Sequence, residues 1–432
     1  MTGGGFSGWR MAGDASWNFA ALAVTAATGA VMTLLIASLM GTAALGVFAQ
    51  LYAIHVIAAQ VAVAGVHDST QKHAAEHAAG GRTDAAIVAG GLGVVVATAL
   101  PLAGVIALAA APYGALVAST DVGRGLYLVA PGVAAFALNK VLFGAINGRG
   151  RLRLYAWMQV ARAVFVLAAA LAVAGLGWPA WTVGGIFAAA ELALLPCLLA
   201  AVRPSFPRET RQVGTWMRRH LSFGGRGLVN GILLETHLRV DVVTLAYFVS
   251  DRAIGIYAFA ALFAEAIYQV PVVIRTVAYP LFVRLASRGD RAALAHAARR
   301  LSIASGAVSA AAALAVGVGY RFVAAWFDPA FAQTGWPVLQ VLLPGMVVYA
   351  FFVPFDQLLL QSGFPGRQSA LMALYVATNV GLNLLLIPPL GLLGAAIATA
   401  VALGLAGLLL LGASWLWLGY RRSVLLYRTT AA

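Results

Sequence analysis

The chain has 432 residues, of which 62% are apolar and 10% are charged, and its formal net charge is +14. Soluble globular domains are roughly 45–50% apolar and about 25% charged, so this composition excludes that class. The basic residues recur in short clusters between long apolar runs instead of forming one patch, which argues against nucleic-acid binding and predicts an all-α integral membrane protein.

Hydropathy, combined with the positions of turn-forming and charged residues between the apolar runs, predicts twelve transmembrane helices. In chain order they span residues 15–38, 44–66, 84–110, 124–147, 154–175, 180–202, 221–248, 253–283, 300–319, 335–362, 368–387 and 391–418. The eighth contains Pro271, and the tenth contains Pro344 and Pro354, each of which removes a backbone donor. The start of the chain shows no cleavable signal-peptide pattern, so we expect the first apolar run to span the membrane.

The distribution of basic residues predicts the orientation of these helices. With a cytoplasmic N-terminus, the cytoplasmic segments hold 20 of the 28 Lys and Arg residues, whereas the external segments hold only Arg124, Arg252 and Arg321. This bias follows the positive-inside rule and places both termini in the cytoplasm. The longest cytoplasmic segment lies near the midpoint, so we expect two six-helix lobes, 1–205 and 221–432, joined by a basic linker at 206–220.

Two internal matches support a duplication. The stretch at 44–49 recurs at 253–258, and the stretch at 150–164 recurs at 366–380. Both shifts correspond to six spans, so the two repeats are parallel and related by a pseudo-two-fold axis along the membrane normal. Such two-lobed architectures are typical of alternating-access transporters.

Ten charged residues fall inside the predicted spans, where each costs about 2.5–3.5 kcal/mol on insertion scales and therefore calls for a reason. The basic ones are Lys140, Arg162, Arg226, Arg239 and Arg275, and the acidic ones are Glu191, Glu235, Asp241, Glu265 and Asp356. Lys140 and Arg226 lie near helix ends and are compatible either with snorkelling to the headgroups or with a cavity role. Asp356 follows Pro354 and either caps freed backbone donors or binds an ion.

The seventh span carries a polar stripe at helical spacing that cannot face lipid. Its members are Ser222, Arg226, Asn230, His237, Asp241 and Thr244. On the opposite side, Glu235 precedes Arg239 by four residues, the favourable order for a structural ion pair. His55 and His237 are read either as proton relays or, more conservatively, as buried histidines with satisfied hydrogen bonds.

Fainter polar stripes occupy three further spans. The fifth span carries Tyr155, Gln159 and Arg162, and the eleventh carries Tyr375, Asn379 and Asn383. The eighth carries Glu265 and Gln269 on one face and Arg275 on an adjacent face. These positions predict inward-facing surfaces.

No enzyme signature or cofactor motif occurs in the chain. There is no Gly-rich phosphate loop with Lys, so ATP is not the expected energy source. His73, Glu76 and His77 resemble a metal site only loosely, because Ala74 stands where a metalloprotease needs Glu. We therefore expect this cluster to be a loop at the membrane surface, with neither metal nor cofactor.

Five stretches taken together resemble the bacterial polysaccharide (O-antigen) flippases, the lipid-linked oligosaccharide branch of the superfamily that also contains the multidrug and toxic-compound extrusion transporters. They are residues 40–49, 147–151, 237–241, 251–257 and 280–284. With the twelve-span layout, the resemblance covers essentially the whole chain.

This resemblance implies a V-shaped pair of six-helix lobes. It also implies a function, the transfer of undecaprenyl-pyrophosphate-linked oligosaccharide from the inner to the outer leaflet of the bacterial cytoplasmic membrane, coupled to H⁺ or Na⁺. Membrane lipids, polysaccharide polymerase and export proteins are the implied partners. Lipid II flippases of the same superfamily generally carry two more helices, which argues against a peptidoglycan precursor.

The residues fit this expectation because a diphosphate is a compact anion that arginine binds through a planar fork of donors. The candidate substrate-binding residues are Arg162, Arg226 and Arg275, then Lys140 and Arg239 for the diphosphate, and Asn230 and His237 for sugar hydroxyls. The candidates for ion coupling are Glu265, Asp241, Glu191 and Asp356.

Two rival functions stay open. A cation-coupled multidrug antiporter of the same superfamily would use the intramembrane acids for both substrate and coupling ion. A non-transporting scaffold of a glycan assembly complex would need the basic cytoplasmic loops and not the intramembrane charges.

Overall fold

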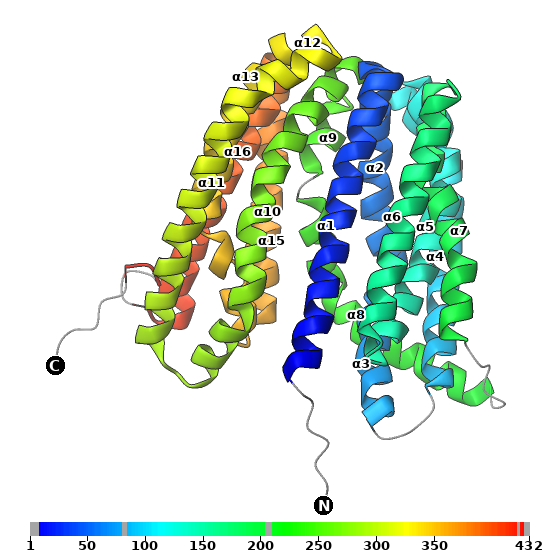
Figure 1. The fold of residues 1–432 in the computed structure, drawn as a ribbon, viewed down its shortest axis with the longest axis vertical. Coiled ribbons are helices and arrows are strands. Elements are labelled where there is room, and N and C mark those ends of the chain that lie inside the picture. Colours follow the sequence, from blue (N-terminus) through cyan, green and yellow to red (C-terminus); the bar gives the residue numbers. More distant parts are fainter. Residues whose placement is uncertain (1–7, 80–83, 204–209, 238, 421–423, 427–432) are drawn as a thin grey trace, which may run out of the picture. The chain divides into compact units, whose positions relative to one another are not determined.

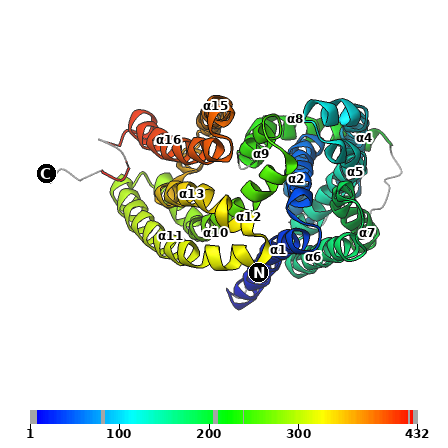
Figure 2. The same ribbon diagram turned by 90° about the horizontal axis from the view of Figure 1, so that it is seen from above.

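The computed structural model describes residues 8–79, 84–203, 210–237, 239–420 and 424–426, with some side chains of its first and eighth helices excepted. The chain divides into two compact units, residues 1–235 and 236–432. Both units consist of helices joined by short connecting segments in the described ranges (Figures 1 and 2).

The first unit contains α1 (Gly8–Leu39), α2 (Thr42–Val63), α3 (Val66–Ala79), α4 (Ala85–Leu116), α5 (Thr120–Gly148), α6 (Leu152–Gly175), the 3-10 helix η1 (Ala180–Gly184), α7 (Gly185–Val202) and α8 (Thr210–Thr236). The second contains α9 (Val240–Leu245), α10 (Asp251–Ser287), α11 (Arg291–Phe327), α12 (Pro329–Gln333), α13 (Gly335–Ala350), η2 (Val353–Phe355), α14 (Leu358–Gln361), α15 (Pro365–Leu390) and α16 (Leu392–Leu418).

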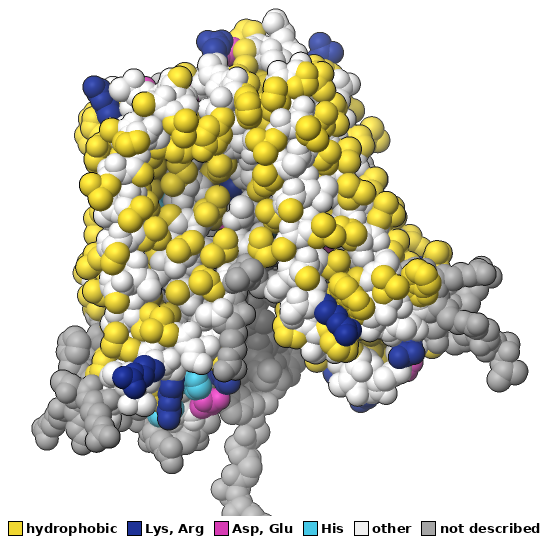
Figure 3. Space-filling view, turned by 180° about the vertical axis from the view of Figure 1, so that it is seen from behind, with side chains coloured by type: hydrophobic (Ala, Val, Ile, Leu, Met, Phe, Trp, Pro, Cys, Tyr) yellow, Lys and Arg dark blue, Asp and Glu magenta, His cyan; other side chains and the backbone are white. Residues whose placement is uncertain are grey.

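Within the described ranges, nine helices are long and apolar enough to cross a membrane, and the bent pair Gly335–Ala350 and Val353–Gln361 makes a tenth. The first predicted span corresponds to α1, whose described apolar part is Ala23–Leu39. Hydrophobic side chains spread over the middle of the face drawn in Figure 3, and most Lys and Arg side chains in view lie toward its upper and lower ends. The prediction of an all-α, multi-pass membrane protein is thereby confirmed.

The prediction of one continuous seventh helix over 221–248 is wrong. Helix α8 starts earlier, at Thr210, and ends at Thr236, and α9 begins only at Val240. The polar run from Glu235 to His237 interrupts the apolar sequence at this break. The expected stripe therefore does not lie on one helix, and Glu235 and Arg239 are not on a common helical face.

The polar segment read as a surface loop, His67 to His77, forms helix α3, and α8 packs against it (Figure 1). The Trp216 ring lies 5.1 Å from the ring of His73 and 5.5 Å from that of His77. Gly65 and Gly224 are in backbone contact, and a Cβ on Gly224 would collide with the carbonyl oxygen of Ala64. The described part of the expected linker, 210–220, is therefore a packed helix of the first unit, and the division between units falls after residue 235.

His220 fixes α8 to two helices at once. Its Nδ1 lies 2.8 Å from the hydroxyl of Ser69 on α3, and its Nε2 lies 3.0 Å from the carbonyl oxygen of Ile87 on α4. Its side chain is fully buried. Burial lowers the pKa of His220 to about 4, below its ordinary value near 6.5.

We predict that acid loosens the contact of α8 with α3 and α4. Between pH 6.5 and about 4, unfolded His220 binds a proton that folded His220 does not, so the stability present above pH 6.5 is lost as the pH falls through this window. The full loss is about 3 kcal/mol. Hydrogen exchange of residues 210–220 at pH 7 and pH 4 measures it. His220→Gln should flatten the pH dependence and exposed His296→Gln should not; an unchanged slope in His220→Gln would contradict the assignment.

The internal repeat is visible in the helices themselves. When Gly150 is aligned with Gly366, an alignment that we call the repeat register, α5 corresponds to the broken segment α13–η2–α14, α6 to α15, and α7 to α16. Val202 and Leu418 end the last helix of each repeat, and the following residues, Arg203 (φ 45°) and Gly419 (φ 71°), both cap it in the left-handed conformation. The duplication predicted from short sequence matches thus extends to helix boundaries and caps.

The cores of the two units repeat as well. In the first unit, Leu142 and Leu194 belong to a buried cluster beside α5, α6 and α7. Their counterparts in the repeat register, Leu358 and Leu410, belong to a buried cluster with Phe355 in the second unit. In each unit the fourth, fifth and sixth spans of the repeat therefore meet around a common core, and a hollow lies beside each of these cores.

Candidate binding pockets

The first hollow, which we call the first pocket, has a volume of about 270 Å³ and is formed by helices α5, α6 and α7. Its lining residues are Phe136, Asn139, Lys140, Phe143, Tyr155, Gln159, Arg162 and Glu191. The stripe predicted on the fifth span, Tyr155, Gln159 and Arg162, lies entirely on this wall, so the expectation that it faces inward is confirmed.

An ion pair closes one side of the first pocket. Arg162 Nε donates to Glu191 Oε1 at 2.6 Å, and the Glu191 side chain is only 1% exposed. Asn139 donates its amide to Glu191 Oε2 at 2.8 Å and to the Glu191 carbonyl oxygen at 2.9 Å. Glu191 was predicted as an ion-coupling acid; its two carboxylate oxygens accept from Arg162 and Asn139, and the coupling role stays a prediction.

Lys140 provides a second cation in the first pocket. Its ammonium lies 5.4 Å from the centre of the Phe136 ring, and the Arg162 guanidinium lies 5.0 Å from the same ring. Within the described part of the chain, no carboxylate comes within ion-pair distance of Lys140, because Glu191 is taken by Arg162. Among the residues that line the pocket, two cations face one carboxylate, so the lining itself carries a net positive charge.

His55 on α2 lies behind the same aromatic wall. Its ring is 5.1 Å from Phe187 and 5.8 Å from Phe136, and it is 3% exposed. Neither ring nitrogen has a hydrogen-bond partner among the described residues. His55 is thus buried, as the conservative reading expects, but without the hydrogen bonds to described residues that this reading supposes.

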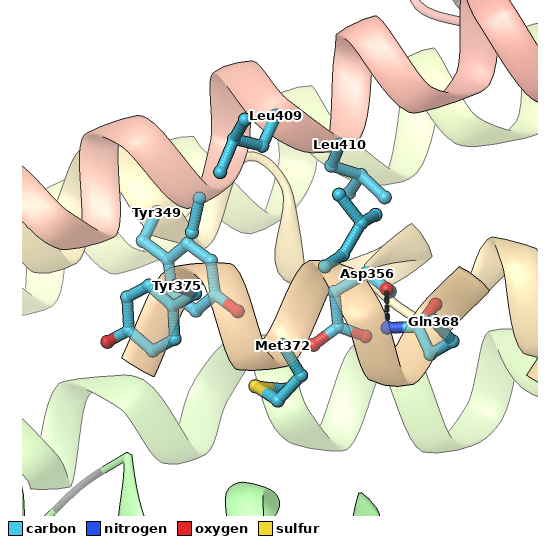
Figure 4. A pocket seen from close by; sticks show the side chains of 9 residues that line it. Tyr349, Asp356, Gln368, Met372, Tyr375, Leu409 and Leu410 are labelled. Carbon is cyan, nitrogen blue, oxygen red and sulfur yellow. Dashed lines mark hydrogen bonds between the residues drawn. The ribbon is translucent and has the colours of Figure 1, made fainter. Parts of the chain in front are cut away.

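The second hollow, the second pocket, has a volume of about 410 Å³ and is formed by the end of α13, the residue after η2, and helices α15 and α16. It is lined by Tyr349, Asp356, Gln368, Leu371, Met372, Tyr375, Ala406, Leu409 and Leu410. Figure 4 shows Tyr349 and Tyr375 at one end, Asp356 and Gln368 at the other, and Met372 between them. Aromatic and apolar walls with a few polar groups are typical of small-molecule sites.

The acid of the second pocket is neutralised by Arg275 from α10. Arg275 Nη1 donates to Asp356 Oδ2 at 2.6 Å, and the two side chains are 16% and 12% exposed. Gln368 donates its amide to the carbonyl oxygen of Asp356 at 3.0 Å, while Gln368 Oε1 has no partner among the described residues. Arg275 was predicted to contact diphosphate; one of its nitrogens pairs with Asp356, and the predicted contact stays a prediction.

The other predicted residues of the second unit lie elsewhere. Arg239 pairs with Glu265 at 3.0 Å rather than with Glu235. The Tyr257 hydroxyl donates to the buried carboxylate of Asp241, which also accepts from the backbone of Val242. Neither group lines either pocket.

Three further predicted residues belong to the break between α8 and α9 or to α8 itself. His237 packs its ring 5.8 Å from that of Tyr375, next to the second pocket but not in its lining. Arg226 and Asn230 lie on α8, and their side chains are outside the described part of the structure. Their predicted substrate contacts stay predictions.

Sequence reasoning missed the polar residues Asn139 and Gln368 and the aromatic residues Phe136, Phe143 and Tyr349. Single polar or aromatic residues in an apolar helix carry no period of their own. The repeat did contain a signal, because Lys140 and Asp356 correspond in the repeat register and each lines the pocket of its own unit.

No family model matches the sequence. One curated protein that it resembles is the "Probable flippase AglR" of Haloferax volcanii, 23% identical over 280 residues, covering 62% of this chain and 56% of that protein. The match therefore spans little more than half of the relative's length.

Solved structures resemble the chain over most of its length. A structure of "Lipid II flippase MurJ, inward closed conformation" covers 90% of this chain and 85% of its own, with a TM-score of 0.70 and 12% identity. The chain has the fold of the MOP-superfamily transporters. An inward-facing multidrug resistance MATE family transporter of that superfamily covers 91% of this chain and 96% of its own, with a TM-score of 0.64 and 14% identity. All three proteins are named as flippases or transporters, in agreement with a non-enzymatic membrane protein.

Proposed function

We propose that this protein is a flippase of bacterial polysaccharide biosynthesis that moves an undecaprenyl-pyrophosphate-linked oligosaccharide from the inner to the outer leaflet of the cytoplasmic membrane. The observation that carries the proposal is Lys140, a cation inside an apolar helix that lines a pocket and has no carboxylate partner among the described residues. A cation in an apolar helix without an ion-pair partner is costly and therefore calls for an anion, and a lipid-linked diphosphate supplies one at membrane depth.

The rest of the first pocket supports this assignment. Arg162 already serves Glu191 but keeps donors that the carboxylate does not use, and guanidinium donors suit phosphate oxygens. The Phe136 ring beneath both cations excludes water from one side, which strengthens an electrostatic contact. The relative named as a probable flippase and the MurJ fold agree with a lipid-linked substrate.

In this proposal the protein works by alternating access with both termini in the cytoplasm, driven by a gradient of H⁺ or Na⁺. The acids available for coupling are Asp241, Glu265 and Asp356. Asp241 is the most buried of the three, and its partners are a tyrosine hydroxyl and a backbone amide instead of a cation. Asp241 can therefore bind and release a proton or a sodium ion without breaking an ion pair, and it is the acid best suited to couple transport to a gradient.

The experiment is a comparison of three lysine variants in cells depleted of the chromosomal protein, with mass analysis of undecaprenyl-pyrophosphate-linked oligosaccharides. We expect these lipids to accumulate on depletion and to be cleared by wild type and Lys140→Arg but not by Lys140→Gln. Lys72→Gln is the matched control, because Lys72 also lies over a phenylalanine ring, that of Phe223, at 5.1 Å but is exposed.

A binding measurement tests the same step with purified protein. Charge-assisted hydrogen bonds contribute about 1.5–3 kcal/mol, so Lys140→Gln should weaken binding of inorganic pyrophosphate to protein in nanodiscs by roughly 10- to 100-fold. An unchanged lipid pool on depletion, together with unchanged pyrophosphate affinity, would contradict the proposal.

The multidrug antiporter is the second candidate, and the fold shared with MATE transporters favours it equally. It predicts that lipophilic cations are exported and that neutralising the acids abolishes this export. The scaffold alternative predicts that Lys140→Gln is silent in both assays. The lysine variants, together with variants of the acids assayed for cation export, therefore separate all three functions.

A further inference from the structure

The two pockets occupy equivalent places in the two repeats. The first is built by α5, α6 and α7, and the second by α13 with η2, α15 and α16, which are the fourth, fifth and sixth spans of each repeat. Three lining positions coincide in the repeat register, where Lys140, Tyr155 and Gln159 of the first pocket correspond to Asp356, Leu371 and Tyr375 of the second. Independent hollows would not be expected to share helices and lining positions in this way, so they descend from one duplicated pocket.

The duplicated pockets differ in charge. In the first, Lys140 and Arg162 face the single carboxylate of Glu191, which leaves a net positive charge. In the second, Asp356 replaces the lysine and is matched by Arg275, which leaves no net charge. A charge-balanced pocket has no preference for an anion or a cation, so its ligand is selected by hydrogen bonds and shape.

The second pocket offers groups that suit hydroxyls and the apolar faces of sugar rings. Tyr349 and Tyr375 place two rings at one end (Figure 4), and flat aromatic faces pack against the CH-bearing faces of pyranose rings. Asp356 and Gln368 stand at the other end, and the Oε1 acceptor of buried Gln368 has no protein partner among the described residues.

We infer that the second pocket is a binding site for an uncharged sugar, a duplicate of the first pocket in which an acid stands where the first has a lysine. The inference rests on the proposed function and adds where the glycan part of the substrate is recognised. Asp356, Gln368 and the two tyrosines make the hydrogen bonds and the stacking contact, and Arg275 balances the charge of the accepting carboxylate.

The test is saturation-transfer NMR on the full-length protein in nanodiscs, with maltose and N,N′-diacetylchitobiose as probes. We expect at least one disaccharide to bind wild type and to bind Tyr375→Leu about tenfold more weakly. Met372→Trp fills the hollow without removing a polar group, and we expect it to abolish binding. Tyr279→Leu is the matched control, because Tyr279 belongs to the same unit but is exposed and lies outside the pocket.

Lys140→Gln separates this inference from the proposed function. It should lose pyrophosphate binding and keep the sugar signal. A sugar signal that persists in Met372→Trp, or no signal with either disaccharide in wild type, would overturn the sugar site even if pyrophosphate binds the first pocket. Displacement of the sugar by the lipophilic cation tetraphenylphosphonium, at equal concentration, would overturn it in favour of a cation site.

Discussion

Arg162→Met is expected to lower the free energy of unfolding by about 3–5 kcal/mol, because it leaves a buried carboxylate without its cation. The Glu191 side chain is 1% exposed and its Oε1 accepts from Arg162 at 2.6 Å. Unfolding in mixed micelles of mild detergent and dodecyl sulfate measures the loss. Arg252→Met is the control, because its pair with Asp328 is 3.4 Å long and the arginine is 62% exposed, so a change of only about 0–1 kcal/mol is expected.

The double variant Arg162→Met/Glu191→Leu should regain most of that stability, because it removes both charges together. Asn139 keeps one of its two bonds to residue 191, the one to the backbone carbonyl. A loss below about 1 kcal/mol in Arg162→Met would contradict this expectation. It would show that Lys140, the neighbouring cation, takes over the carboxylate.

The fold was predictable because membrane helices obey a simple rule. Apolar runs of sufficient length mark each span, and ten of the expected twelve are recovered among the described residues. The seventh failed because the segment from Thr210 to Thr236 is amphipathic and polar. Its contacts with α3 and α4 depend on Trp216 and His220, and hydropathy gives no information about what such residues meet in space.

The candidate site was predictable in its charges but not in their pairing. Arg162, Lys140 and Asp356 were identified because charge at membrane depth is costly, and each lines a pocket. The partners came from other helices, with Glu191 29 residues from Arg162 and Asp356 81 residues from Arg275. A helical period relates residues on one helix and cannot report such distant pairs.

The sequence also predicted an ion pair that the structure does not contain, the i, i+4 pair of Glu235 and Arg239. The spacing was favourable, but the helix ends between the two residues, and Arg239 reaches Glu265 on α10 instead. Local spacing predicts an ion pair only when the backbone between the residues is helical. The polar run that suggested the pair is also what ends the helix.

Arg275→Met is expected to cost about 3–5 kcal/mol of stability, as Arg162→Met does, because Asp356 is 12% exposed and loses its only cation within the described structure. The double variant Arg275→Met/Asp356→Leu should recover most of this loss in the same unfolding assay. It removes both charges, and leucine suits the apolar neighbours Leu371 and Leu410.

Transport by this double variant distinguishes a structural pair from a functional one. If the second pocket receives part of the substrate, depleted cells that produce the stable double variant should still accumulate lipid-linked oligosaccharide. The reason is that the variant lacks the Asp356 acceptor. A stable double variant that clears the lipids like wild type would show that the pair only holds α10 against the segment after η2. Because the double variant is stable, a loss of transport cannot be attributed to unfolding. Such a loss would mean that transport itself requires the charged groups of the second pocket.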